Sequence, residues 1–231
     1  NLNEAFTFVR DFHDNMLQGL FTNKQANVYS KVTNLFGELS GFMAQNSLVN
    51  YNYVYDQMVG YGELLSTTIV SEYLKDIGVF NKWIDVRELV KTDSNYRDAK
   101  VNWENTEDTI QKNIDTDTLN ITQGFLGGSN NETTTLGREG SDYTAGIFAY
   151  CLNAKSVTIW KDVDGVLNAD PRVFNETRLL KEISYTEAIE MAFYGASVIH
   201  PKTIQPLEKK NIPLYVRTFD NLNKKGTKVN Y

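Results

Sequence analysis

The chain has 231 residues, of which 41% are hydrophobic and 23% are charged; this globular balance excludes a disordered tail, a collagen-like fibre and a coiled-coil rod. Asp and Glu outnumber Lys and Arg by 29 to 23, and this acidic balance argues against a nucleic-acid partner. The single cysteine excludes an internal disulfide, and no apolar run reaches the roughly 18 residues that a membrane helix needs. We therefore expect a cytoplasmic protein without a membrane or nucleic-acid partner.

The first 78 residues are predicted to be helical, because their apolar residues recur at three- and four-residue steps. The segment from Tyr61 to Thr67 is interpreted as a helix start, where the helix dipole would stabilise Glu63. The elements expected up to residue 114 are helices near 6–16, 35–42 and 62–74, a strand over 83–90, a loop over 93–102 and a helix over 104–114.

From residue 119 onward, predicted strands alternate with predicted helices. Ser184 and Glu187 form a capping box, and Gly195 is placed to end the helix that it opens. This alternation predicts an α/β fold, a three-layer αβα sandwich around a mainly parallel central sheet, in a single domain. The expected elements are strands over 119–127, 157–160 and 212–217, a polar loop after 127, and helices over 141–153 and 184–194.

The segment from Gly137 to Asp142 is a candidate anion site. It precedes a predicted helix, whose N-terminus offers unpaired N–H groups and a partial positive charge. Arg138 adds a planar fork suited to a carboxylate, Ser141 is a candidate N-cap, and Asp142 is favourable in the first turn. A solvated Arg138 beside an ordinary capped helix is equally compatible with these residues.

A second candidate site follows the strand that ends near Trp160, because ligands of parallel sheets bind beyond the carboxyl ends of the strands. Lys161 and Arg172 are suited to phosphates, and Asp162 and Asp164 to a ribose, a lysine or a hydrated Mg²⁺. A plain turn is the alternative. An EF-hand is excluded, because its glycine would stand further along the loop and no helix-loop-helix is predicted around this segment.

Three further polar residues are candidates for a functional role. His200 has no second His or Cys nearby, so a turn histidine is favoured over a metal ligand. Lys202, just past a proline, is within reach of a phosphate, and Glu63 is suited to an ammonium group. The chain contains no Gly-x-x-x-x-Gly-Lys-Ser/Thr, Gly-x-Gly-x-x-Gly or Gly-x-Ser-x-Gly sequence, so it carries no sign of a P-loop, a dinucleotide fold or a serine hydrolase.

Taken in order and spacing, these segments resemble the catalytic domain of aspartokinases, within the amino acid kinase superfamily. The clear resemblance covers about residues 60–228. The matching segments are Tyr61-Gly-Glu-Leu-Leu-Ser-Thr67, Thr92-Asp-Ser-Asn95, Thr122-Gln-Gly-Phe125, Thr133-Thr-Thr-Leu-Gly-Arg-Glu-Gly-Ser-Asp-Tyr-Thr-Ala145, Asp162-Val-Asp-Gly-Val166, Asp170-Pro-Arg172, Glu187-Ala-Ile-Glu-Met-Ala192, Tyr194-Gly-Ala196 and His200-Pro-Lys-Thr203.

The resemblance implies a reaction in which ATP, with Mg²⁺, phosphorylates the β-carboxylate of L-aspartate to 4-phospho-L-aspartate, the first step toward lysine, threonine and methionine. It assigns no metal ligand to the chain. The implied roles are substrate binding for Glu63, Arg138 and Ser141, ATP binding for Lys161, Asp162, Arg172 and Ser197, and catalysis for Asp142, which would organise a phosphate-binding lysine, and for Lys202.

The chain departs from the aspartokinase pattern at several places. The strand that carries Lys-Phe-Gly-Gly-Thr-Ser is not found, and Ser197 stands where lysine is common. Lys161 stands where threonine is common and Glu139 where glycine is common, so the Glu139 side chain is expected to point away from the anion site. We expect residues 1–231 to be an N-terminally incomplete catalytic domain without C-terminal regulatory domains, inactive alone and homo-oligomeric in the full-length protein.

Two alternatives stay open. One is another carboxylate kinase of the superfamily, such as glutamate 5-kinase or acetylglutamate kinase. The other is a truncated, inactive domain that binds a nucleotide.

Overall fold

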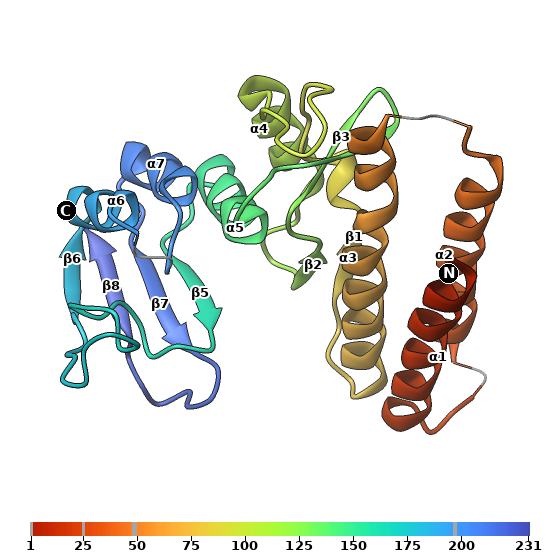
Figure 1. The fold of residues 1–231 in the computed structure, drawn as a ribbon, viewed down its shortest axis with the longest axis horizontal. Coiled ribbons are helices and arrows are strands. Elements are labelled where there is room, and N and C mark those ends of the chain that lie inside the picture. The colour runs from red at the N-terminus through yellow and green to blue at the C-terminus, as the bar shows by residue number, and fades with distance from the viewer. Residues whose placement is uncertain (1, 25, 48–49, 196–197) are drawn as a thin grey trace.

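The computed structural model describes residues 2–24, 26–47, 50–195 and 198–231 (Figure 1). The helices of these residues are α1 (Leu2–Leu20), α2 (Asn27–Gln45), α3 (Tyr51–Asp76), the 3-10 helix η1 (Val86–Glu88), α4 (Trp103–Asn113), α5 (Gly140–Cys151), α6 (Tyr185–Phe193) and α7 (Pro201–Lys210). The strands are β1 (Lys82–Ile84), β2 (Asn120–Thr122), β3 (Leu126–Ser129), β4 (Glu132–Thr135), β5 (Val157–Lys161), β6 (Glu182–Ser184), β7 (Leu214–Thr218) and β8 (Thr227–Asn230).

Helices α1, α2 and α3 form the N-terminal part of the molecule, as the apolar spacing predicts (Figure 1). Their shared core includes Leu17, Phe36 and Ile69. Helix α3 is longer than expected, because Asn50 caps it by accepting hydrogen bonds from two backbone N–H groups of its first turn. The placement of Glu63 at a helix start is therefore wrong: this residue lies in the middle of α3, beyond the reach of the N-terminal dipole.

The middle of the chain contains more turns than its sequence predicted. The strand expected over 83–90 is only β1, and η1 follows it directly, capped by the Asp85 side chain. The strand expected over 119–127 is interrupted, because Phe125 has a φ of 70°. The expected polar loop after residue 127 is wrong. A β3–β4 hairpin forms there, with Asn130 and Asn131 both in the left-handed region at its turn.

The C-terminal part of the chain is built on a four-stranded sheet in the order β5-β7-β8-β6. The β5–β7 and β6–β8 pairs are parallel, and the β7–β8 pair is antiparallel. Helices α5, α6 and α7 supply residues to the core that covers this sheet, among them Ala149, Ala188 and Leu207. Strands β6 and β8 and helix α7 were not predicted. Helix α7 begins at Pro201 and contains Pro206, and two prolines so close together are more typical of a turn.

The α/β fold class is confirmed, and α5 occupies the centre of the arrangement. Ala149 of α5 packs in the core of the four-stranded sheet, whereas Ile147 and Cys151 pack in a second core with Val86 and Ile110. Instead of one continuous central sheet, the described residues form a parallel β1–β2 pair, the β3–β4 hairpin and the four-stranded sheet. Among these residues, β2 pairs only with β1, and β5 pairs only with β7. No strand pairing within the described residues therefore joins the β1–β2 pair to the four-stranded sheet.

The capping box of α6 provides a first prediction, on stability. The Ser184 side chain accepts a hydrogen bond from the backbone of Glu187, and Glu187 accepts one from the backbone of Ser184, as predicted. We expect Ser184→Ala to lower the free energy of unfolding by about 1 kcal/mol. Thr186→Ala, an exposed position in the same turn, is the matched control. Equal denaturation midpoints for the two variants would contradict the prediction.

Candidate functional site

The first part of the candidate site lies at the N-terminus of α5. Arg138 is exposed and makes no hydrogen bond or ion pair with any other described residue. The helix starts at Gly140, and its N-cap is Glu139, which has a φ of 55° and makes no side-chain capping bond. The prediction of Ser141 as the N-cap is therefore wrong. Since no side chain of the described residues caps the first turn of α5, its N–H groups remain available to an anion.

Lys161, the last residue of β5, lies against this helix terminus. Its Nζ is 2.8 Å from Oδ2 of Asp142 and 3.3 Å from Oε2 of Glu139. Burial disfavours the charged form of Lys161, but the two carboxylates outweigh it and raise the pKa of the ammonium group. Contrary to expectation, Glu139 does not turn away from the site, because Lys161 offsets its charge.

A cavity of about 270 Å³ opens beside these residues, and its lining includes Arg138, Glu139, Phe193 and His200. His200 caps α7, since its Nδ1 accepts a hydrogen bond from the backbone N–H of Lys202. Burial, followed by the positive charges of Lys202 and Arg138, lowers the pKa of His200. A neutral capping histidine agrees with its interpretation as a turn residue.

Lys202 forms an ion pair with an acidic residue that the sequence did not indicate as part of the site. Its Nζ forms an ion pair with Asp98, which lies 104 positions earlier in the loop before α4. The same Asp98 packs against Gly137, where an added Cβ would lie 2.7 Å from its carboxylate. The ammonium group thus ties α7 to the loop that packs against Gly137. The assignment of Lys202 to a phosphate stays a prediction.

Asp162 and Arg172 are both exposed. The Arg172 guanidinium binds the neighbouring carboxylate of Asp170 at 2.7 Å, and within the described residues no hydrogen bond or ion pair joins it to Asp162 or to Lys161. The assignment of both residues to a nucleotide site stays a prediction. Ser197, which was assigned to the same site, lies outside the described residues.

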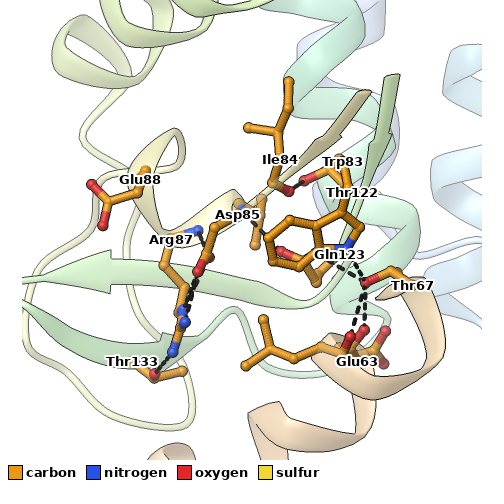
Figure 2. Close-up of polar contacts among 12 residues, drawn as sticks. Glu63, Thr67, Trp83, Ile84, Asp85, Arg87, Glu88, Thr122, Gln123 and Thr133 are labelled. Carbon is orange, nitrogen blue, oxygen red and sulfur yellow. Dashed lines mark hydrogen bonds and ion pairs between the residues drawn. The ribbon is translucent and has the colours of Figure 1, made fainter. Parts of the chain in front are cut away.

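The second part of the candidate site is Glu63, in the middle of α3 (Figure 2). Its carboxylate is half-buried and makes no hydrogen bond or ion pair with any described residue. Burial raises the pKa of this carboxyl group. A half-buried carboxylate without a partner costs free energy, so the site is suited to a cationic ligand.

Next to Glu63 lies a hydrogen-bonded group whose role the sequence did not indicate (Figure 2). The Thr67 hydroxyl accepts hydrogen bonds from Nε2 of Gln123 at 2.9 Å and from Nε1 of Trp83 at 3.1 Å. Gln123 is only 1% exposed, and its Oε1 accepts the backbone N–H of Val86 at 2.8 Å. The sequence signal for this group is the segment Thr122-Gln-Gly-Phe125 within the predicted strand over 119–127, which by itself gives the glutamine no role.

Ser141 lines a different cavity from that of Arg138, of about 500 Å³. Gln123, Gly124 and Phe148 also line it. A Cβ at Gly124 would lie 2.8 Å from the backbone and side chain of Ser141, so only glycine permits this approach. Residues 123 and 124 thus connect the surroundings of Glu63 with the start of α5.

Two classes of feature are not found in the described part of the chain. Its His, Cys, Asp and Glu residues form no group of three or more arranged to hold a metal ion. Each of its helices is too short or too polar to cross a membrane.

Comparison with known proteins gives consistent matches. The model of the amino acid kinase family matches residues 9–218. Lysine-sensitive aspartokinase 3 of Escherichia coli (strain K12) is 39% identical over 178 residues, which are 75% of this chain and 40% of the relative. The chloroplastic bifunctional aspartokinase/homoserine dehydrogenase 2 of Zea mays is 38% identical over 207 residues, 87% of this chain and 22% of the relative.

The fold also matches a solved structure. The crystal structure of Escherichia coli aspartokinase III in complex with aspartate and ADP aligns with a TM-score of 0.90 and 32% identity over 98% of this chain. This chain covers 51% of that one, and less than half the length of the two curated relatives. The family match begins near residue 9, well before the first sequence motif at Tyr61. The resemblance to aspartokinases is confirmed, and the chain belongs to the amino acid kinase family.

Proposed function

We propose that the protein transfers the γ-phosphate of ATP to the β-carboxylate of L-aspartate, forming 4-phospho-L-aspartate. The observation that carries this proposal is the alignment of 98% of the chain, at a TM-score of 0.90, with an aspartokinase in complex with aspartate and ADP. The unpartnered charges of the site support it. Arg138 and Glu63 are complementary to the carboxylate and the ammonium group of an amino acid.

The chemistry requires little beyond positioning and charge compensation. A carboxylate is already a nucleophile, so no strong base is needed, and two anionic reactants must be held in line. In the proposed arrangement Arg138 binds a substrate carboxylate, with the Ser141 hydroxyl assisting, and Glu63 binds the ammonium group. Lys161, oriented by Asp142 at 2.8 Å, approaches the nucleotide phosphates together with the uncapped N-terminus of α5.

The proposed nucleotide is ATP, with Mg²⁺ as the accompanying cation. Because no acidic or histidine cluster of the described residues is arranged to hold a metal ion, the side chains do not fit a protein-held Mg²⁺. The ion is expected to be coordinated by the phosphates of the nucleotide. The cytoplasmic location and the homo-oligomeric state stay predictions, and the matched relative of Zea mays is a chloroplastic protein.

The proposed function is tested by measuring ADP release from ATP by the full-length protein. We expect release that depends on L-aspartate, and much less with L-glutamate or N-acetyl-L-glutamate as the acceptor. Preference for either glutamate compound would favour the alternative carboxylate kinases. Nucleotide binding without release in the presence of any of the three acids would favour an inactive domain.

The placement of Lys161 leads to a prediction about nucleotide affinity. We expect Lys161→Met to weaken MgATP binding by about 1.5–3 kcal/mol, since a charge-assisted hydrogen bond to a phosphate is lost. Isothermal titration calorimetry measures the change. Lys112→Met is the control, because Lys112 binds the carboxylate of Asp108 at 2.7 Å on the exposed face of α4, apart from both candidate segments. Arg172→Ala tests the second assigned residue. Unchanged affinity in either site variant would remove that residue from the nucleotide site.

A further inference from the structure

We propose that Thr67 is a positioning residue for Glu63, and that Gln123 and Trp83 hold it in place. The inference rests on the proposed function, in which Glu63 binds the ammonium group of the substrate. It goes beyond that function by assigning a role to three residues that do not touch the substrate.

The hydroxyl of Thr67 uses its full hydrogen-bonding capacity. A hydroxyl has one proton to donate and two lone pairs that accept. The two lone pairs accept from Gln123 and Trp83, at 2.9 and 3.1 Å. The proton is donated to the backbone carbonyl of Glu63, at 2.8 Å, one helical turn earlier. The hydroxyl is thus bonded directly to the residue whose carboxylate lacks a partner.

The two donors come from different strands. Trp83 lies in β1, and Gln123 follows the last residue of β2. Gln123 is fixed in turn by the backbone N–H of Val86, 2.8 Å from its Oε1. Figure 2 shows the hydrogen bonds from Trp83 and Gln123 meeting at Thr67 of α3. The Thr67 hydroxyl therefore sets the rotation of α3 relative to the β1–β2 pair.

The direction of the Glu63 side chain depends on this rotation. Among the described residues, no hydrogen bond or ion pair restrains the carboxylate itself, so its aim is set by the helix backbone. Displacement by about 1 Å is enough to impair a reaction that requires two reactants in line. Loss of the hydroxyl would also leave the buried amide of Gln123 without its partner, which favours rearrangement.

Thr106 is the control for the loss of a threonine hydroxyl from a helix. It is a fully buried helical threonine, whereas Thr67 is partly buried, and its hydroxyl accepts a hydrogen bond from the backbone N–H of Lys91 at 3.0 Å and donates one to the carbonyl of Lys91 at 3.2 Å. It lies in α4 and makes no hydrogen bond with Glu63, Thr67 or Gln123. Removing the Thr106 hydroxyl should therefore lower the stability of the fold without changing the direction of the Glu63 side chain.

The test compares Thr67→Val, Thr67→Ser and Thr106→Val in the full-length protein, with kcat, the KM of aspartate, the KM of ATP and Tm measured for each. We expect Thr67→Val to raise the KM of aspartate about tenfold, with the KM of ATP changed less than about twofold. Thr67→Ser keeps the hydroxyl and should restore the aspartate KM. Thr106→Val should lower Tm without moving either KM.

A double-mutant cycle with Glu63→Gln separates positioning from general destabilisation. Once Glu63 is neutral there is no carboxylate to aim, so Thr67→Val should have no further effect on the aspartate KM. If Thr67→Val lowers Tm as Thr106→Val does and leaves the aspartate KM unchanged, the inference is overturned. If Thr67→Val does not fold, Trp83→Phe removes one donor and keeps an aromatic ring, and an unchanged aspartate KM in this variant also overturns it.

The failure of this inference can be distinguished from the failure of the proposed function. If the unmodified protein releases no ADP with aspartate, the proposed function fails. If it does, and Glu63→Gln impairs the use of aspartate while the variants of Thr67 and Trp83 do not, only the positioning role fails.

Discussion

Arg138→Ala is expected to lower kcat/KM for aspartate by roughly 30- to 3,000-fold, which corresponds to about 2–5 kcal/mol. The guanidinium has no partner among the described residues and lines the cavity at the start of α5, where its planar fork can bind a carboxylate at two points. Its removal would leave that carboxylate without its principal cation. The affinity for ATP should change far less, as measured by calorimetry.

Arg138→Lys is the matched variant for this prediction. It keeps the charge but loses the planar two-point geometry, so an intermediate loss is expected. Steady-state kinetics with aspartate as the varied substrate provide the comparison. If kcat/KM for aspartate is the same in Arg138→Ala and the unmodified protein, Arg138 has no role in substrate binding.

Glu63→Gln is expected to lower the use of aspartate by a similar factor while making the protein more stable. The raised pKa of Glu63 means that the folded state favours the protonated carboxyl group. The stabilising contribution of that group is present at low pH and is lost as the pH rises through the folded-state pKa. At neutral pH the ionised Glu63 therefore destabilises the fold, and a neutral glutamine should raise Tm.

Glu72→Gln, on the same helix, should have the opposite effect on stability. Burial raises the pKa of Glu72, but hydrogen bonds and ion pairs with Lys31 and Lys75 outweigh it and lower the pKa overall. That stabilising contribution is present at neutral pH and is lost as the pH falls through the folded-state pKa, so the glutamine variant should lower Tm slightly and leave activity unchanged. A lower Tm in Glu63→Gln would contradict the assignment.

The same raised pKa predicts the pH dependence of the reaction. The carboxylate form of Glu63 binds an ammonium group, so kcat/KM for aspartate should fall as the pH decreases through the pKa of Glu63. Glu63→Gln should lack this acidic limb. A limb that persists unchanged in the variant would assign it to another group.

Local features of the sequence determined much of the architecture. The apolar spacing of 6–16 and 104–114, the capping box at Ser184 and Glu187, and the left-handed Gly195 each act within a few residues, and the structure contains them as predicted. The Asn130-Asn131 hairpin belongs in the same group, because both residues tolerate positive φ. The sequence therefore contains a signal for this turn, although the expectation from the sequence was a polar loop.

The partners of the charged and polar residues were decided only by the tertiary structure. Lys202 binds Asp98, which is 104 positions away in the sequence. Thr67 accepts a hydrogen bond from Gln123, 56 positions away, and Lys161 donates one to Glu139, 22 positions away. Local propensity does not reach so far along the chain, because such contacts depend on how helices and strands pack. Glu63 shows the same limit. Its motif was recognised from the sequence, but its position in mid-helix, its burial and its lack of a partner depend on where α3 begins and what packs against it.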